Sequence, residues 1–440
     1  MQCCSQRTLH RAITVFRGST HSLRSFTVPT MTTGKLDSPQ FKAILTPELT
    51  KLGSLFTSRG YGFRLVGGVV RDLLLGNTPK DIDIATDCTP DAMMEIFKEN
   101  GVRYIPTGLQ HGTITVHSET GVDYEVTTLR VDRITDGRHA VVDFTKDWRL
   151  DSLRRDLTIN SMGLTLDGTL YDYFNGLRHL EERRIQFVGE ARARIQEDYL
   201  RILRYFRFYG RIVPDVDCHD SDTLTAIREN AVGLKGVSVE RVWSELKRIL
   251  VGCHAPHLIQ LMYKLGVADC IGLPTNGNVA ELERAWKVMK GHGHTLQPES
   301  LLMSIVHTVD ESYDLSHAWK LSNDEKRLGA FIVQHRREAS KADTSLKTYQ
   351  DLIVDGAPAR SVVELLYYCD RRALAEEVEK WKVPKMPVNG YDLKMAGFKT
   401  GSEMGLLLRL LKAQWKKSHF TLDKEELLMI ATKTELEPTS

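Results

Sequence analysis

Strand-like patterns in this sequence end near Gly176, and this change divides the chain into a mixed N-terminal part and a helical remainder. Before it, short runs of alternating apolar and polar residues lie between turn-forming residues, as in "DIDIAT" and "VDYEVTT". After it, apolar residues recur every three or four positions, which is typical of amphipathic helices. The sequence therefore predicts an α+β protein, with a small mixed-sheet head followed by an all-helical neck, body and tail.

The length predicts several domains. At 440 residues the chain is longer than one ordinary domain of about 100 to 200 residues. We predict five segments. They are a leader (residues 1–36), a head (37–188), a neck (189–255), a helical body (256–350) and a helical tail (351–440).

The composition is that of a globular protein without a transmembrane segment. Hydrophobic residues make up 42% of the chain and charged residues 26%, and no run of 18 or more apolar residues occurs. The seven cysteines form no C-x-x-C pair, which argues against a zinc site or a disulfide framework.

The first 36 residues have the composition of a mitochondrial transit peptide. They include five basic residues and many Ser and Thr, with no acid before Asp37, although a disordered tail could look similar. Met31 could serve as a second start and give a cytosolic or nuclear form. The remaining residues carry 54 basic and 57 acidic side chains, a formal charge of −3, so a polyanionic partner must meet local basic patches.

Two pairs of acids fall on predicted strands. Side chains alternate along a strand, so Asp81 and Asp83 share one face, and Asp123 and Glu125 share a face of a second strand. Carboxylates that converge in this way suit a divalent cation, and three acids around two such ions are what nucleotidyl transfer requires. A solvated strand end is the alternative interpretation of the first pair.

A glycine pair precedes the first acids by fewer than 17 residues. Gly67 and Gly68 allow close approach of the backbone to a ligand, and the helix predicted to begin there would present free N–H groups to phosphate oxygens. Arg71 lies within the first turns of that helix. A glycine pair alone is more often a packing turn, so the neighbouring acids and arginine carry the phosphate-binding interpretation.

Three ordered motifs resemble those of the class II CCA-adding tRNA nucleotidyltransferases. They are "GGVVRDLLLG" followed by "DIDIAT", then "LRRDLTINSM" (153–162), then "EDYLRILRYFRF" (197–208). The resemblance covers residues 62 to 250. It implies template-independent addition of C, C and A to the 3′ end of tRNA, with CTP and ATP as substrates, tRNA as the partner and Mg²⁺ as the cofactor.

The resemblance also implies roles for individual residues. Asp81 and Asp83 would bind Mg²⁺, and Glu125 would be the third catalytic carboxylate, with Asp123 as its rival by face parity. The nucleotide would be bound by residues from all three motifs, namely Gly68, Arg71, Arg155, Asp156, Asn160, Asp198, Arg201, Arg204 and Arg207.

The spacing of Asp198 and Arg201 suggests how bases are selected. On a single predicted helix they lie one turn apart, beside Arg204 and Arg207. Cytosine and adenine each present an amino donor beside a ring-nitrogen acceptor, whereas guanine and uracil present a carbonyl beside an N–H. A carboxylate next to a guanidinium therefore matches the first two bases, although a charged helix stripe is usually just a solvated face.

Two other functions are compatible with parts of the pattern. A poly(A) polymerase of the same superfamily shares the acids and the arginine motifs, but "IPTGLQHGTITV" (105–116) is similar to the CCA-adding type. A non-catalytic RNA-binding protein on this fold would not need all three carboxylates. We also expect Arg241 and Glu245 to brace the nucleotide-binding helix.

Overall fold

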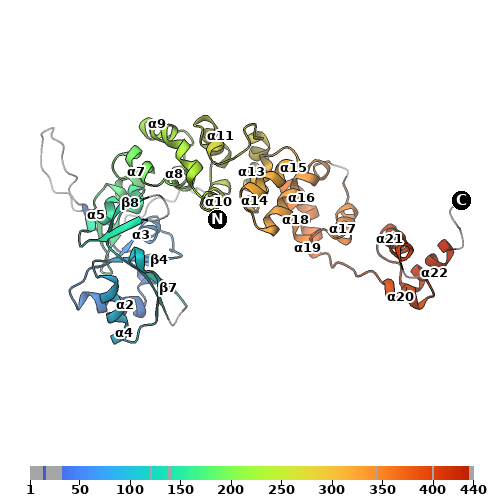
Figure 1. Ribbon diagram of the computed structural model, residues 1–440, viewed down its shortest axis with the longest axis horizontal. Coiled ribbons are helices and arrows are strands. Elements are labelled where there is room, and N and C mark those ends of the chain that lie inside the picture. The colour runs from blue at the N-terminus through green and yellow to red at the C-terminus, as the bar shows by residue number, and fades with distance from the viewer. Residues whose placement is uncertain are drawn as a thin grey trace. The chain divides into compact units, whose positions relative to one another are not determined.

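The computed structural model describes residues 13–15, 32–118, 121–135, 140–341, 344–398 and 401–435 (Figure 1). The chain forms two compact units, residues 1–283 with 314–321 and residues 284–313 with 322–440. This division is coarser than the five segments expected from the sequence, and those boundaries stay predictions.

A mixed sheet is the framework of the first unit. Among the described residues, nine strands pair in the order β1-β2-β11-β10-β3-β4-β7-β6-β5. Every pair is antiparallel except β4–β7, which is parallel. The strands are β1 (Ile13–Val15), β2 (Thr32–Leu36), β3 (Phe63–Val66), β4 (Ile82–Thr86), β5 (Tyr104–Gly108), β6 (Thr113–His117), β7 (Asp123–Thr128), β10 (Gly163–Leu164) and β11 (Thr169–Asp172).

The sheet begins inside the range predicted as a leader. Strand β2 pairs with β11, and Leu36 at its end is only 3% exposed. Strand β1 adds to the free side of β2. Met31 and most of the other leader residues lie outside the described residues.

Helices cover one face of the sheet. Phe63 of β3 contacts Phe56 of α2 (Pro47–Thr57), with ring centroids 5.2 Å apart, and Phe56 contacts Phe97 of α4 (Pro90–Glu99) at 5.8 Å. Ile82 and Ile84 of β4 are buried, as the alternation in "DIDIAT" predicts. Asp83 therefore points to the opposite face.

The segment after β7 forms a separate ribbon and a run of helices. Strands β8 (Arg130–Thr135) and β9 (Ala140–Phe144) pair antiparallel with each other. The following helices of this unit are α5 (Trp148–Leu153), α6 (Gly176–Glu181), α7 (Ala191–Glu197), α8 (Arg201–Ile212), α9 (Ser221–Asn230), α10 (Val239–Leu250), α11 (Ala255–Lys264) and α12 (Val267–Cys270), and α1 (Pro39–Ile44) and α3 (Gly68–Leu74) lie earlier in the chain.

The predicted single helix through Asp198 is two helices. Asp198 has an extended backbone (φ −155°, ψ 104°) that ends α7, and its side chain accepts a hydrogen bond from the Leu200 N–H. A short polar side chain that bonds nearby backbone competes with the helix in this way. Asp198 thus lies in the corner between α7 and α8, not on a helix face.

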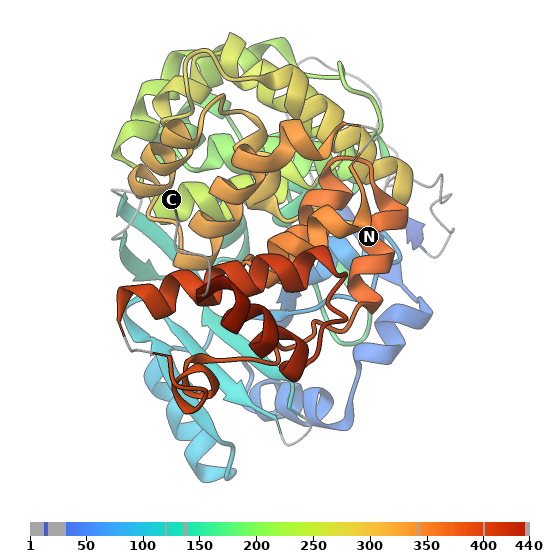
Figure 2. The same ribbon diagram turned by 90° about the vertical axis from the view of Figure 1, so that its right-hand side faces the viewer.

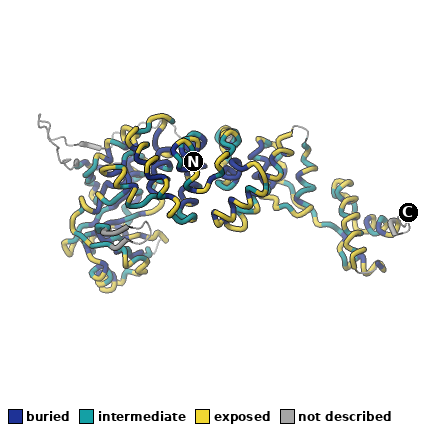
Figure 3. The backbone as a smooth tube through the Cα atoms, turned by 45° about the horizontal axis from the view of Figure 1, so that its top comes forward, coloured by how far each residue is buried: buried dark blue, intermediate teal, exposed yellow. Residues whose placement is uncertain are grey.

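The second unit consists of helices, drawn in orange to red in Figures 1 and 2. Val388, Leu393, Leu411, Trp415 and Leu427 form a small core among the last three helices and the segment before them. Buried and exposed positions alternate along the helices (Figure 3). The helices are α13 (Val279–His292) and α15 (Val309–Ala318), which extend across the boundary between the units, and α14 (Pro298–Ser304), α16 (Asn323–Ala339), α17 (Leu346–Val354), α18 (Ala359–Tyr368), α19 (Arg372–Lys380), α20 (Gly390–Met395), α21 (Ser402–Lys417) and α22 (Lys424–Glu435).

Within the described part of the chain, no helix is both long enough and apolar enough to cross a lipid bilayer.

Candidate active site

The predicted acids lie on the face of the sheet opposite to α2 and α4. In the parallel β4–β7 pair, Asp83 lies directly beside Glu125, and Asp81 immediately precedes β4. Asp83 is half-buried, whereas Asp81 and Glu125 are exposed. Burial and the nearby charges of Glu125 and Asp81 raise the pKa of Asp83, and Arg155 opposes this rise.

The two candidates for the third acid have different neighbours. Asp123 is hydrogen-bonded to His117 on the neighbouring strand, with 2.7 Å between the carboxylate oxygen and Nδ1. Glu125 instead lies level with Asp83. The register therefore favours Glu125.

These acids fit a divalent cation by their chemistry. Among the described residues, no three His, Cys, Asp or Glu side chains form a ready-made metal site. Mg²⁺ is commonly held by one or two carboxylates together with substrate phosphates, so a complete protein cage is not required. Burial is the main cause of the raised pKa of Asp83, and a cation would relieve the repulsion from Glu125 and Asp81 that adds to it.

The glycine pair lies between the acids and the arginine motif. Gly67 has a φ of +71° and caps α3, in which Gly68 is the first residue. A Cβ on Gly67 would lie 3.1 Å from Arg155 Nη1 and 3.9 Å from Asp83 Oδ2. The backbone angle favours glycine, and a Cβ here would also push against the end of the Arg155 side chain.

Replacing Gly67 with Ala should therefore impair the site. The positive φ should cost about 1 to 3 kcal/mol of stability, and displacement of Arg155 should lower catalytic efficiency by at least about tenfold. Gly189 is a matched control, because it also has a positive φ of +75° but nothing within 4 Å of its would-be Cβ. Gly189→Ala should show a stability cost alone. Chemical denaturation and steady-state kinetics test both variants, and equal activity losses would contradict the steric argument.

A polar cleft of about 460 Å³ brings most of the predicted residues together. Seven arginines and three aspartates line it, so the cleft suits an anion such as a triphosphate. Asp81 and Glu125 are not among its lining residues. The lining residues are Gly67, Gly68, Arg71, Asp83, Arg154, Arg155, Asp156, Asn160, Asp198, Leu200, Arg201, Arg204, Arg207, Phe208 and Arg241.

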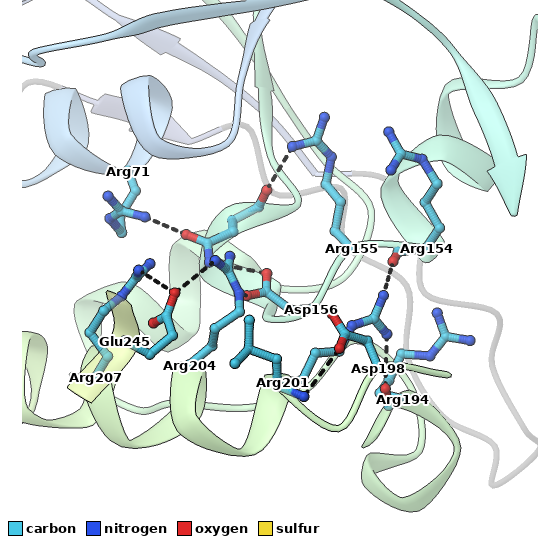
Figure 4. A network of polar contacts seen from close by, with 12 residues as sticks. Arg71, Arg154, Arg155, Asp156, Arg194, Asp198, Arg201, Arg204, Arg207 and Glu245 are labelled. Atoms are coloured by element: carbon cyan, nitrogen blue, oxygen red, sulfur yellow. Dashed lines mark hydrogen bonds and ion pairs between the residues drawn. The ribbon is translucent and has the colours of Figure 1, made fainter. Parts of the chain in front are cut away.

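A chain of hydrogen bonds connects the head motifs to α8 (Figure 4). Arg71 donates to the Asn160 side chain, whose amide donates to Asp156 at 3.2 Å. Asp156 also accepts a 2.6 Å bond from Arg204 Nε. Asn160 and Asp156 therefore contact protein arginines in this structure as well as lining the cleft.

The cleft arginines are crowded and partly desolvated. Burial lowers the pKa of Arg207 to about 10, although its ion pair with Glu245 at 2.9 Å opposes this shift. Burial likewise lowers the pKa of Arg71. Positive charges that are costly to bury favour binding of an anionic ligand.

The side chains of Asp198 and Arg201 bond to other partners and not to each other, although the Arg201 N–H donates to the Asp198 carbonyl at 3.0 Å. Arg201 donates to Glu197 at 2.7 Å and to the backbone carbonyls of Arg194 and Arg154 at 3.0 and 2.8 Å (Figure 4). Asp198 forms its ion pair with Arg241 at 2.7 Å. The two predicted selector residues both line the cleft, but separate partners hold them.

Sequence reasoning did not assign Asp151 or Phe208 to this site, nor the cleft-lining Arg154 and Arg241. Asp151, which is 3% exposed, accepts bonds from Arg154 and Arg155, and the four-residue spacing from Asp151 to Arg155 could have indicated this. Phe208 lies beneath the guanidinium groups of Arg71 and Arg207, at 4.8 and 4.3 Å from its ring centre. Its sequence context indicates only a core position.

Two family models match this chain. Residues 63–186 match the model described as "Poly A polymerase head domain", and residues 220–271 match "Probable RNA and SrmB- binding site of polymerase A". The first range contains the acids and the "LRRDLTINSM" motif.

The full-length relatives are more specific. The mouse protein "CCA tRNA nucleotidyltransferase 1, mitochondrial" is 50% identical over 412 residues, which cover 91% of this chain and 94% of the relative. The human protein of the same name is 49% identical over 411 residues, with the same coverage.

The fold of this chain is also similar to that of solved CCA-adding enzymes. A crystal structure of the Bacillus stearothermophilus CCA-adding enzyme in complex with CTP matches with a TM-score of 0.71 at 25% identity, over 91% of this chain and 98% of that one. The expected α+β architecture, with a nucleotidyltransferase head and a helical remainder, is thus confirmed. The chain belongs to the family of CCA tRNA nucleotidyltransferases.

Proposed function

We propose that this protein adds C, C and A in turn to the 3′ end of tRNA, using CTP and ATP, releasing pyrophosphate and copying no nucleic-acid template. The observation that carries the proposal is identity of about half the residues to the mouse and human enzymes over nearly the whole chain. The arginine-lined cleft beside the strand acids supplies a physical basis for it.

Catalysis falls to the acids of β4 and β7. Asp81 and Asp83 would hold Mg²⁺, and Glu125, beside Asp83, would complete the set of carboxylates. A bound Mg²⁺ would supply activation of the attacking 3′ hydroxyl and stabilisation of negative charge on the phosphate. Burial and the neighbouring acids raise the pKa of Asp83, and the positive charge of Arg155 opposes this rise.

The nucleotide occupies the cleft. In this proposal the triphosphate is held by Gly68, Arg71 and Arg155. Their place in the lining of the cleft supports this role. Arg204 and Arg207 contribute further positive charge from α8. Asp156 and Asn160 set the positions of Arg204 and Arg71 through hydrogen bonds and reach the ribose from the same wall.

Base selection rests on the corner between α7 and α8. Asp198 offers an acceptor and Arg201 a donor to the pairing edge of cytosine or adenine. Guanine or uracil would leave these groups unpaired, at a cost of about 1 to 3 kcal/mol each. The protein thereby replaces a template.

A primer-extension assay tests this function. Incubation of the protein with tRNA lacking its last three nucleotides, Mg²⁺, CTP and ATP should give CCA addition and then arrest, as read by sizing and sequencing of the 3′ ends. A long run of adenosines would instead identify a poly(A) polymerase, and tRNA binding without extension would identify an inactive relative.

We also propose that the protein acts in mitochondria and that residues 1–36 are its targeting segment. The mouse and human relatives are named as mitochondrial enzymes, and this segment is basic and free of acids. A form begun at Met31 keeps all of β2 and loses β1, so the sheet through β11 is retained. Fluorescent fusions of the full chain and of the Met31 form should go to mitochondria and to the cytosol or nucleus, respectively. The same location for both would contradict the proposal.

A further inference from the structure

We propose that Arg241 is a positioning residue for base selection, which fixes the Asp198 carboxylate as an acceptor aimed at the nucleobase. This inference rests on the proposed function. It goes beyond a general bracing role, because it predicts a specific change in which nucleotides are used.

The corner between α7 and α8 does not hold Asp198 by itself. Its backbone is extended, so no helix constrains the side chain. One carboxylate oxygen accepts the Leu200 N–H at 3.1 Å, and the other accepts from the Arg241 guanidinium at 2.7 Å. Of these two contacts, only the one with Arg241 comes from another helix, α10.

Arg201 is held independently of Asp198. Its guanidinium, in a side chain only 11% exposed, is bonded to Glu197 and to two backbone carbonyls. A change at Arg241 therefore acts on the acceptor and leaves the bonds of the donor in place. The cleft lining includes Arg241 together with both of these groups.

The chemistry of the ion pair explains the effect on selection. A carboxylate has about four lone-pair sites, so after these two bonds it can still accept the amino group of cytosine or adenine. The ion pair with Arg241 holds the carboxylate in one place, and its remaining lone pairs face the cleft as acceptors. The carbonyl of uracil or guanine would then meet an oxygen lone pair.

Loss of Arg241 would free the carboxylate to rotate. Several other arginines line the same cleft and would compete for it. The acceptor would then no longer be fixed opposite the amino group. Correct insertion should slow, and discrimination against uridine and guanosine should weaken.

Single-turnover insertion of each nucleotide on matched tRNA primers tests this inference. For Arg241→Met we expect the ratio of CMP to UMP insertion, and of AMP to GMP insertion, to fall about tenfold. Arg241→Lys should recover part of the ratio. Arg228→Met, at an exposed position on α9, is the matched control and should leave both ratios unchanged.

Two outcomes would overturn the inference. The first is an equal loss for all four nucleotides with unchanged ratios, because a purely structural brace would act in that way. The second is a further tenfold fall in the insertion ratios when Arg241→Met is added to Asp198→Asn. If Arg241 acts through Asp198, it should have no such effect once the Asp198 carboxylate is gone. If Arg241→Met does not fold, the Lys variant decides, and an unchanged ratio in it counts against the inference. Failure of the wild-type protein to add CCA would instead refute the proposed function.

Discussion

Asp83→Asn should abolish nucleotide addition and at the same time stabilise the metal-free protein. The variant loses a carboxylate of the metal site, so activity should fall by at least about 1,000-fold. Its fold should benefit, because the half-buried Asp83 lies beside Glu125 and near Asp81, and burial with these charges disfavours its ionised form. Primer extension measures the loss, and thermal unfolding without Mg²⁺ measures the gain.

The pH dependence follows from the sign of the shift. Because folding raises the pKa of Asp83 above its ordinary value of 3.8, ionisation of this group costs stability as pH rises through that window. The advantage of Asp83→Asn should therefore be present at neutral pH and vanish below about 3.8. Added Mg²⁺ should stabilise the wild type and have little effect on the variant. An active Asp83→Asn would show that the metal assignment is wrong.

The same assay separates the two candidates for the third acid. Glu125→Gln should lose activity as Asp83→Asn does, since Glu125 is level with Asp83 in the parallel pair. Asp123→Asn should retain most activity, because Asp123 is paired with His117. The reverse result would assign the role to Asp123.

The local pattern was sufficient to predict the elements that carry the acids. Strict alternation in "DIDIAT" and "VDYEVTT" predicted both strands and which side chains share a face, and β4 and β7 agree. The pattern could not choose between Asp123 and Glu125, because that choice depends on the register of two strands separated by α4, β5 and β6. Register between distant strands is set by the whole sheet.

The corner at Asp198 was missed for a different reason. Charged residues recur every three or four positions from Arg194 through Asp198 and Arg201 to Arg207, so the periodicity continues through the break between α7 and α8. The extended backbone of Asp198 and the bond from the Leu200 N–H to its side chain mark the interruption. Strands β10 and β11 are short, and they pair with β3 and β2, which lie far earlier in the chain.

Asp156→Ala should destabilise the protein by about 3 kcal/mol, which would separate a structural role from substrate contact. Asp156 is 7% exposed and forms an ion pair with Arg204, so its loss leaves the guanidinium without this partner. Breaking a buried ion pair costs about 3 to 5 kcal/mol, and we take the low end because the Arg204 side chain is 31% exposed. Burial alone would raise the pKa of Asp156, but Arg204 outweighs it and lowers the pKa. The ionised Asp156 therefore stabilises the fold above pH 3.8, the ordinary pKa of an aspartate, and this stabilisation is lost as the pH falls below that value. The difference in unfolding free energy between wild type and Asp156→Ala should thus be smaller in acid. Denaturant unfolding at pH 7 and pH 3 measures this, with the exposed Asp91, on α4, changed to Ala as control. Wild-type stability combined with a raised KM for CTP would instead mean that Asp156 serves the nucleotide alone.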